Sequence, residues 1–331
     1  MTVPGSVRES VAEAIRDLEG SDARITGITR VVGGCINNGA RIDTSTSERY
    51  FLKWNDAAPD GMFRAEADGL EALRSAADRV PREVRPRIPR PLAQRPPGSG
   101  PDWLLMEWIE PARRGGPASG GGPTPGGGPT PGGDPISSGG DDHQARLGHG
   151  LALLHQVDVG PTFGWSEDNW IGSLPQQNRP SPSWADFWRD RRIVPQLELA
   201  RGSGHLGDRL LDDLVAAIPD ALADVGSPSL VHGDLWSGNS YAAAGGAPAL
   251  VDPAVYRGHG EVDLAMSELF GGFPGSFYDA YDEVRPIAAH YGSHRRALYQ
   301  LYYLLVHVNL FGRSYVAGCR RAAETVLAAM G

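Results

Sequence analysis

Apolar residues near the start of the chain repeat first with the period of a helix and then with that of strands. Between Val7 and Leu18 they recur every three to four positions, which predicts an amphipathic helix that opens with a capping box at Ser6. A second helical pattern begins at Met62. Strand-like runs lie before and after it, at 24–32, 40–44, 49–54 and 103–108, with a Pro-rich loop at 81–101. A small β-rich unit is therefore expected.

Helical patterns dominate the rest of the chain. They cover about 142–156, 184–200, 206–218, 261–271, 276–290, 294–311 and 319–330. Only two short apolar runs, ending before Asp234 and Asp252, read as buried strands. We therefore expect an α+β fold of two lobes, with a small β-rich N-lobe over 1–108 and a larger, mainly helical C-lobe over 142–331.

Residues 109–141 are expected to contain the end of a hinge followed by an insertion. Within them, Gly120–Pro125 and Gly126–Pro131 repeat the same Gly/Pro-rich sequence without a single apolar core residue. Such a composition cannot bury enough apolar surface to order a chain. We predict a disordered surface insertion without a catalytic role.

The strongest candidate chemistry lies where the two short strands end. Asn239 stands five positions after Asp234, and Asp252 thirteen positions after Asn239. This order is typical of a phosphoryl-transfer site, in which one carboxylate receives the proton of the attacking hydroxyl. Asn239 and Asp252 would hold Mg²⁺, a hard ion that prefers oxygen ligands, against the phosphates of ATP. The alternative is an ordinary polar loop between strands.

Lys53 is the only lysine among 31 Lys and Arg residues, and it lies on a predicted strand. Kinases grip the nucleotide phosphates with such a lysine, aimed by a glutamate on the following helix. Glu66 and Glu71 are both candidates for that glutamate. Glu66 is preferred, because it shares a helix face with Phe63 and Leu70. The alternative is a surface lysine retained by chance.

Two further segments complete a nucleotide site. Gly33, Gly34 and Cys35 lie in a Gly-rich turn between strands, where backbone N–H groups can close on phosphates. Glu107 and Ile109 lie in a hinge-like segment whose backbone would meet adenine. Cys35 is read either as an activated, redox-sensitive thiol or as a small residue that a turn tolerates.

Composition narrows the class of protein. The 31 basic and 40 acidic residues give a net charge of −9, which argues against nucleic acid as a partner. An apolar leader is not evident, and the segment 298–311 is too short and polar to span a membrane, so we expect a cytoplasmic protein with no membrane partner. We expect a monomer, or a homodimer linked through Cys35.

With Lys53, Glu66, Asp234, Asn239 and Asp252 in this order, the chain resembles the fructosamine kinase family, whose protein-kinase-like fold is related to that of the aminoglycoside phosphotransferases. The resemblance covers roughly 10–330. Its most specific segment is His232-Gly233-Asp234-Leu235-Trp236-Ser237-Gly238-Asn239. Other family-like segments include Phe163-Gly164, Asp168-Asn169, Ile171-Gly172, Phe270-Gly271-Gly272-Phe273-Pro274 and Phe311-Gly312-Arg313.

The resemblance implies ATP- and Mg²⁺-dependent phosphorylation of the 3-hydroxyl of a ketosamine, a glycation adduct, followed by loss of the sugar. Asp234 matches the catalytic aspartate of the family. His232 and Asp263 would support the loop that carries it, and Asp263 would do so by accepting hydrogen bonds from the loop backbone. Trp236 would stack on the sugar or its amine, unless it is a core aromatic.

Two other functions remain open from the sequence. One is an aminoglycoside or choline phosphotransferase on the same fold, because fold-level likeness does not settle the acceptor. The other is a catalytically inactive, nucleotide-binding redox module. The intact set of catalytic and metal-binding residue types speaks against the second.

Overall fold

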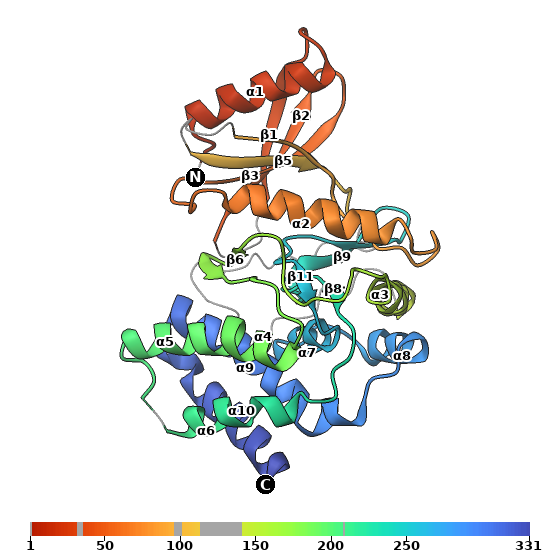
Figure 1. Ribbon diagram of the computed structural model, residues 1–331. Helices are drawn as coiled ribbons and strands as arrows, with labels where there is room; N and C mark the ends of the chain where they lie inside the picture. Colours follow the sequence, from red (N-terminus) through yellow and green to blue (C-terminus); the bar gives the residue numbers. More distant parts are fainter. Residues whose placement is uncertain (1, 32–35, 96–100, 113–140, 208) are drawn as a thin grey trace, which may run out of the picture.

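The computed structural model describes residues 2–31, 36–95, 101–112, 141–207 and 209–331 (Figure 1). A sheet with two helices forms one lobe, and the remaining helices form a larger lobe beside it. The expected α+β, two-lobed architecture is confirmed. The predicted insertion falls mainly on 113–140, outside the described residues.

The N-terminal sheet is antiparallel and holds a core on each of its faces. Its strands follow the order β1-β2-β3-β5-β4. They are β1 (Ile25–Val31), β2 (Asn38–Thr44), β3 (Arg49–Asn55), β4 (Pro91–Gln94) and β5 (Asp102–Glu107). Helix α1 (Gly5–Glu19) covers one face, and α2 (Met62–Ala77) lies between the other face and the helical lobe (Figure 1).

The alternation of side chains along β3 decides where Lys53 points. Leu52 and Trp54 belong to the apolar core under α1, together with Val11. Successive residues of a strand face opposite sides of a sheet, so Phe51 and Lys53 face away from α1. The lysine therefore meets α2 and the space between the lobes.

Two sequence expectations in this lobe were wrong. No capping box forms at Ser6; α1 starts at Gly5, with Pro4 as N-cap and no side-chain cap hydrogen bond. The expected loop at 81–101 contains strand β4, which begins at Pro91. The prolines in this segment had indicated a loop. Proline is tolerated in β4 because β4 is the last strand of the sheet, where a missing N–H donor leaves no partner unpaired.

The helical lobe is built around α9 (Arg296–Phe311), whose residues Leu298, Leu301 and Leu305 are fully buried. The other α-helices are α3 (Asp141–Leu154), α4 (Trp184–Trp188), α5 (Val194–Gly202), α6 (Leu210–Ala221), α7 (Glu261–Leu269), α8 (Gly275–Val284) and α10 (Val316–Met330). The segment expected to be one helix over 184–200 is continuously helical, with a π-helical turn, Arg189–Ile193, between α4 and α5. Among the described helices, none combines the length and the apolar composition of a membrane-spanning segment.

Three short antiparallel pairs position the segments between the lobes. They pair β6 (Asn169–Ile171) with β7 (Leu174–Gln176), β8 (Ser229–Val231) with β11 (Tyr256–Gly258), and β9 (Ser240–Ala242) with β10 (Pro248–Leu250). As expected, Asp234 follows one buried strand, β8, and Asp252 follows another, β10. The β6–β7 hairpin was not predicted.

Candidate active site

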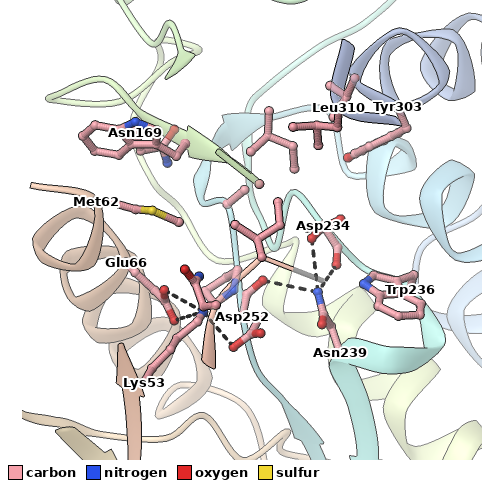
Figure 2. Close-up of a pocket in the computed structure, with 18 of the residues that line it drawn as sticks. Lys53, Met62, Glu66, Asn169, Asp234, Trp236, Asn239, Asp252, Tyr303 and Leu310 are labelled. Atoms are coloured by element: carbon pink, nitrogen blue, oxygen red, sulfur yellow. Dashed lines mark hydrogen bonds and ion pairs between the residues drawn. The ribbon is translucent and has the colours of Figure 1, made fainter. Parts of the chain in front are cut away.

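A cavity of about 350 Å³ lies between the two lobes, and six of the predicted site residues line it. Strand β3 and helix α2 supply one wall, and the segments after β8 and β10 supply the floor. The predicted residues brought together here are Lys53, Glu66, Asp234, Trp236, Asn239 and Asp252 (Figure 2).

Lys53 is held by two carboxylates. Its Nζ lies 2.8 Å from both carboxylate oxygens of Glu66 and 3.1 Å from Oδ1 of Asp252 (Figure 2). Glu71, the other candidate, instead pairs with Arg74 on the surface of α2, with 3.0 Å between Nη2 and Oε1. The structure thus places Glu66, and not Glu71, beside the lysine.

Both members of the Lys53–Glu66 pair are ionised at neutral pH. Burial lowers the pKa of Lys53, but the carboxylates of Asp252 and Glu66 outweigh this and raise the pKa above its ordinary value. Burial raises the pKa of Glu66 to about 6, and Lys53 opposes that rise. A fixed cation therefore faces the cavity beside Asp252.

The backbone before Asp234 is held by a buried carboxylate on α7. Oδ2 of Asp263 accepts a hydrogen bond from the backbone N–H of His232 at 2.7 Å, and Oδ1 accepts one from Gly233 at 2.8 Å. Gly233 has φ +79°, and a Cβ there would lie 2.1 Å from the carbonyl oxygen of Ala254. Only glycine fits this tight, left-handed position.

His232 ties the same loop to the segment that carries Asp252. Its Nε2–H donates to the carbonyl of Val251 at 3.0 Å, so its Nδ1 is left to accept the N–H of Asp234 at 3.3 Å. Burial lowers the pKa of His232, which keeps the ring neutral as these two contacts require. The structure thus gives His232 and Asp263 the contacts of supporting residues.

Asp234 carries a carboxylate with a raised pKa. Burial raises its pKa to about 7, the carboxylate of Asp252 adds to the rise, and Asn239 and Lys53 oppose it. Nδ2 of Asn239 donates to the backbone O and to Oδ2 of Asp234, at 2.9 and 3.2 Å. A carboxylate with a pKa close to neutral can hold a proton and release it again under ordinary conditions.

Asn239 and Asp252 fit a magnesium ion. The Asn239 amide nitrogen also donates to the backbone carbonyl of Asp252, at 3.3 Å, so its oxygen remains available as a ligand. Asp252 adopts a left-handed backbone, with φ 54°, and its side chain is one-third exposed. Among the described residues no group of three or more His, Cys, Asp or Glu side chains could hold a metal. Mg²⁺ bound by Asn239 and Asp252 would take further oxygen ligands from the phosphates of ATP.

Aromatic and apolar side chains line the far side of the cavity, and sequence reasoning missed most of them. Tyr303, His307 and Phe311 lie on one face of α9, and the β6–β7 hairpin contributes Trp170. The spacing of four residues along 303–311 was the available signal, since such residues share a helix face. Trp236 lines the cavity while its ring packs on Gly238.

The remaining site predictions lie away from the cavity or outside the described residues. Glu107 and Ile109 do not line it: the carboxylate of Glu107 is 2.7 Å from Nη2 of Arg87, and Ile109 is buried against Ala243. Gly33, Gly34 and Cys35 are outside the described residues, so their roles, including a redox-active Cys35, stay predictions. Their described neighbours over 36–39 do line the cavity.

Comparisons with known proteins agree on one family. The fructosamine kinase family model matches residues 7–119 and 135–329. The probable ketoamine kinase of Synechocystis sp. is 39% identical over 309 residues, which are 93% of this chain and 92% of the relative. The chloroplastic protein-ribulosamine 3-kinase of Arabidopsis thaliana is 35% identical over 304 residues, 90% of this chain and 81% of that protein.

Comparison with solved structures supports the same family and fold. A Haemophilus somnus protein assigned as a fructosamine-3-kinase matches with a TM-score of 0.77 at 26% identity, over 96% of each chain. An aminoglycoside phosphotransferase matches over 97% of this chain and 99% of its own with a TM-score of 0.56 at 15% identity, which shows the fold alone. The predicted protein-kinase-like fold is confirmed. The chain belongs to the fructosamine kinase family.

Proposed function

We propose that this protein is an ATP-dependent kinase that phosphorylates the 3-hydroxyl of ketosamines, the sugar–amine adducts of glycation. The observation that carries the proposal is the convergence, in one cavity, of a fixed lysine cation, a carboxylate with a pKa near neutral and two oxygen ligands. Relatives named ketoamine kinase and protein-ribulosamine 3-kinase support the choice of acceptor. Loss of the sugar from the 3-phosphate would make the outcome deglycation.

Asp234 would act on the acceptor. In its ionised form it accepts a hydrogen bond from the attacking hydroxyl, orients it, and takes its proton as the bond to phosphorus forms. Its loop is fixed by Asp263 and His232, so the carboxylate needs little rearrangement when the acceptor arrives.

Lys53 would act on the nucleotide. Its ammonium group, aimed by Glu66, offsets the negative charge of the ATP phosphates. Asn239 and Asp252 would hold Mg²⁺, which when bound supplies further positive charge at the phosphate oxygens. In a protein of net charge −9, these groups gather positive charge where the phosphates would lie.

The composition of the cavity favours a ketosamine over an aminoglycoside. Among the described lining residues, the acidic ones are Glu66 and Asp252, which pair with Lys53, and Asp234, the proposed base. An aminoglycoside carries several ammonium groups and would need carboxylates on the acceptor side, where aromatic and apolar residues are found instead. Trp236, Phe270 and Phe311 would cover the sugar and the amine attached to it, stacking on the sugar while excluding water.

A panel of acceptors tests the proposal. ADP formation with Mg-ATP would be followed with ribulosyl-, erythrulosyl- and fructosyl-lysine, set against aminoglycosides and choline, with the Asp234→Asn variant as the control for contaminating ATPase. We expect turnover with one or more ketosamines, and the phosphate at the 3-position by NMR. Turnover of aminoglycosides or choline alone would refute the acceptor, and equal rates in the variant would refute the role of Asp234.

A further inference from the structure

The loop that carries Asp234 is held from a second side, by helix α9. The hydroxyl of Tyr303 donates a hydrogen bond of 2.8 Å to the backbone carbonyl of Gly233. Tyr303 is 1% exposed, and its side chain also lines the cavity. Burial raises the pKa of Tyr303 well above its ordinary value, so the hydroxyl keeps its proton and remains a donor.

This carbonyl belongs to the peptide group that immediately precedes Asp234. The oxygen of that group is held by Tyr303, and its N–H is held by Nδ1 of His232 at 3.3 Å. A peptide group is planar, so two contacts on opposite edges fix its orientation. The Cα of Asp234 is part of the same plane, so these contacts fix the position of the atom from which its side chain branches.

The same helix face forms part of the acceptor side of the cavity. Val306, His307 and Leu310 follow Tyr303 along α9 and also line the cavity. Figure 2 shows Tyr303 and Leu310 on one helix, across the cavity from Lys53. One element thus contacts both the loop of the base and the space for the acceptor.

We propose that Tyr303 is a positioning residue for phosphoryl transfer: through the carbonyl of Gly233 it fixes the carboxylate of Asp234 relative to an acceptor that rests on α9. The inference rests on the proposed function in requiring that Asp234 be the base. It identifies the Tyr303 hydroxyl as the group that connects the base to the side of the cavity where the acceptor would bind.

The neighbouring tyrosine is a matched control. Tyr302 is also on α9, is also 1% exposed, and also donates one hydrogen bond of 2.8 Å, but to Oε1 of Gln176 and not to the catalytic loop. Tyr302 does not line the cavity. Each Tyr→Phe change deletes one buried hydroxyl and leaves one acceptor unpaired, so the two losses of stability should be similar.

The test compares Tyr303→Phe with Tyr302→Phe in steady-state kinetics and thermal unfolding. We expect both to lower Tm by similar amounts. Tyr303→Phe should lower kcat about tenfold to a hundredfold with KM for acceptor and ATP within about twofold, since misplacing a base costs rate and not binding. Tyr302→Phe should keep kcat within about twofold.

The inference is overturned if Tyr303→Phe keeps kcat within about twofold of the wild type, or loses no more than Tyr302→Phe. Should the Phe variant not stay folded, Tyr303→Met also removes the hydroxyl and adapts better to an irregular site. Failure of the proposed function would give a different experimental result. In that case the wild type turns over no ketosamine, and the comparison is made with the acceptor that it does phosphorylate.

Discussion

At the scale of single residues, burial gives each ionisable group of the site its charge state. Asp234 has a pKa near neutral, Lys53 stays charged because carboxylates surround it, and His232 stays neutral. The sequence showed these residue types and their order. It could not show the pKa values, because those depend on neighbours brought from distant parts of the chain, such as Asp252 beside Lys53.

The pH dependence of activity should report Asp234. The carboxylate must be ionised to accept the proton of the acceptor, and its pKa is about 7 in the free protein. We therefore expect kcat/KM for the acceptor to rise as the pH passes through about 7. In Asp234→Asn this rise should disappear, and the rate should fall by a factor of about 10²–10⁴. An acidic limb near the ordinary aspartate value of about 4 would contradict this.

The ionised carboxylate of Asp234 should also lower the free energy of unfolding above neutral pH. An acid whose pKa is raised by folding binds more protons in the folded state, so stability falls as the pH rises from about 4 to about 7 and stays lower beyond. Asp234→Asn removes the buried charge. Thermal unfolding without nucleotide should show a higher Tm for this variant at about pH 8 and little difference at about pH 4. A lower Tm at the higher pH would argue against the raised pKa.

The two glutamates of α2 offer a matched pair. Glu66→Gln leaves Lys53 with Asp252 as its charged partner and should lower kcat/KM for ATP about tenfold or more, since the ammonium is no longer aimed. Glu71→Gln disturbs a surface pair with Arg74 and should change kcat/KM by less than about twofold. Steady-state kinetics with varied ATP measures both. Similar losses in the two variants would remove Glu66 from the nucleotide site.

At the scale of elements, long periodic segments were predictable and short ones were not. The strand-like run at 49–54 and the helical spacing that begins at Met62 predicted the elements that carry Lys53 and Glu66. The strands of the β6–β7 hairpin have three residues each, too few to show a period. The π-helical turn Arg189–Ile193 widens one turn of a continuous helical segment without interrupting its apolar pattern, so the sequence could not reveal it.

The turn before Asp234 should tolerate only glycine. Gly233→Ala places a Cβ 2.1 Å from the carbonyl oxygen of Ala254, so the loop must move, and we expect a loss of kcat of about 10² or more. Gly245 has a similar φ, +85°, but a Cβ added there would meet nothing within 4 Å. Gly245→Ala should therefore cost about 1–2 kcal/mol of stability and leave kcat unchanged. Equal kcat losses would show that the clash at Gly233 is irrelevant.

At the scale of the whole molecule, the two-lobed arrangement followed from the order of periods along the chain, strands first and helices after. The cavity between the lobes could not be predicted from this order. The wall that would contact the acceptor is assembled from α9, the β6–β7 hairpin and the segment after β8. Those contacts join residues far apart in sequence. Ile171, Gly172 and Phe311, which belong to family-like segments, lie in this wall.

The Gly/Pro tract is expected to be dispensable for catalysis. The family model leaves residues 120–134 unmatched, and the described flanks are anchored without them: the N–H of Ala112 donates to Ala242 at 2.8 Å, and Arg146 donates to the carbonyl of Gly246 at 3.1 Å. Deleting 120–134 should leave Tm and kcat/KM within experimental error, by calorimetry and steady-state kinetics. A large loss of kcat/KM would give the tract a role in the acceptor site.

The most direct test of the central claim is transfer of labelled phosphate from γ-³²P-ATP to a ketosamine by the wild type and by Asp234→Asn. The account predicts a labelled ketosamine 3-phosphate from the wild type, formed in step with ADP, and almost none from the variant. Label that reaches only water, or reaches the ketosamine equally in both proteins, would contradict it.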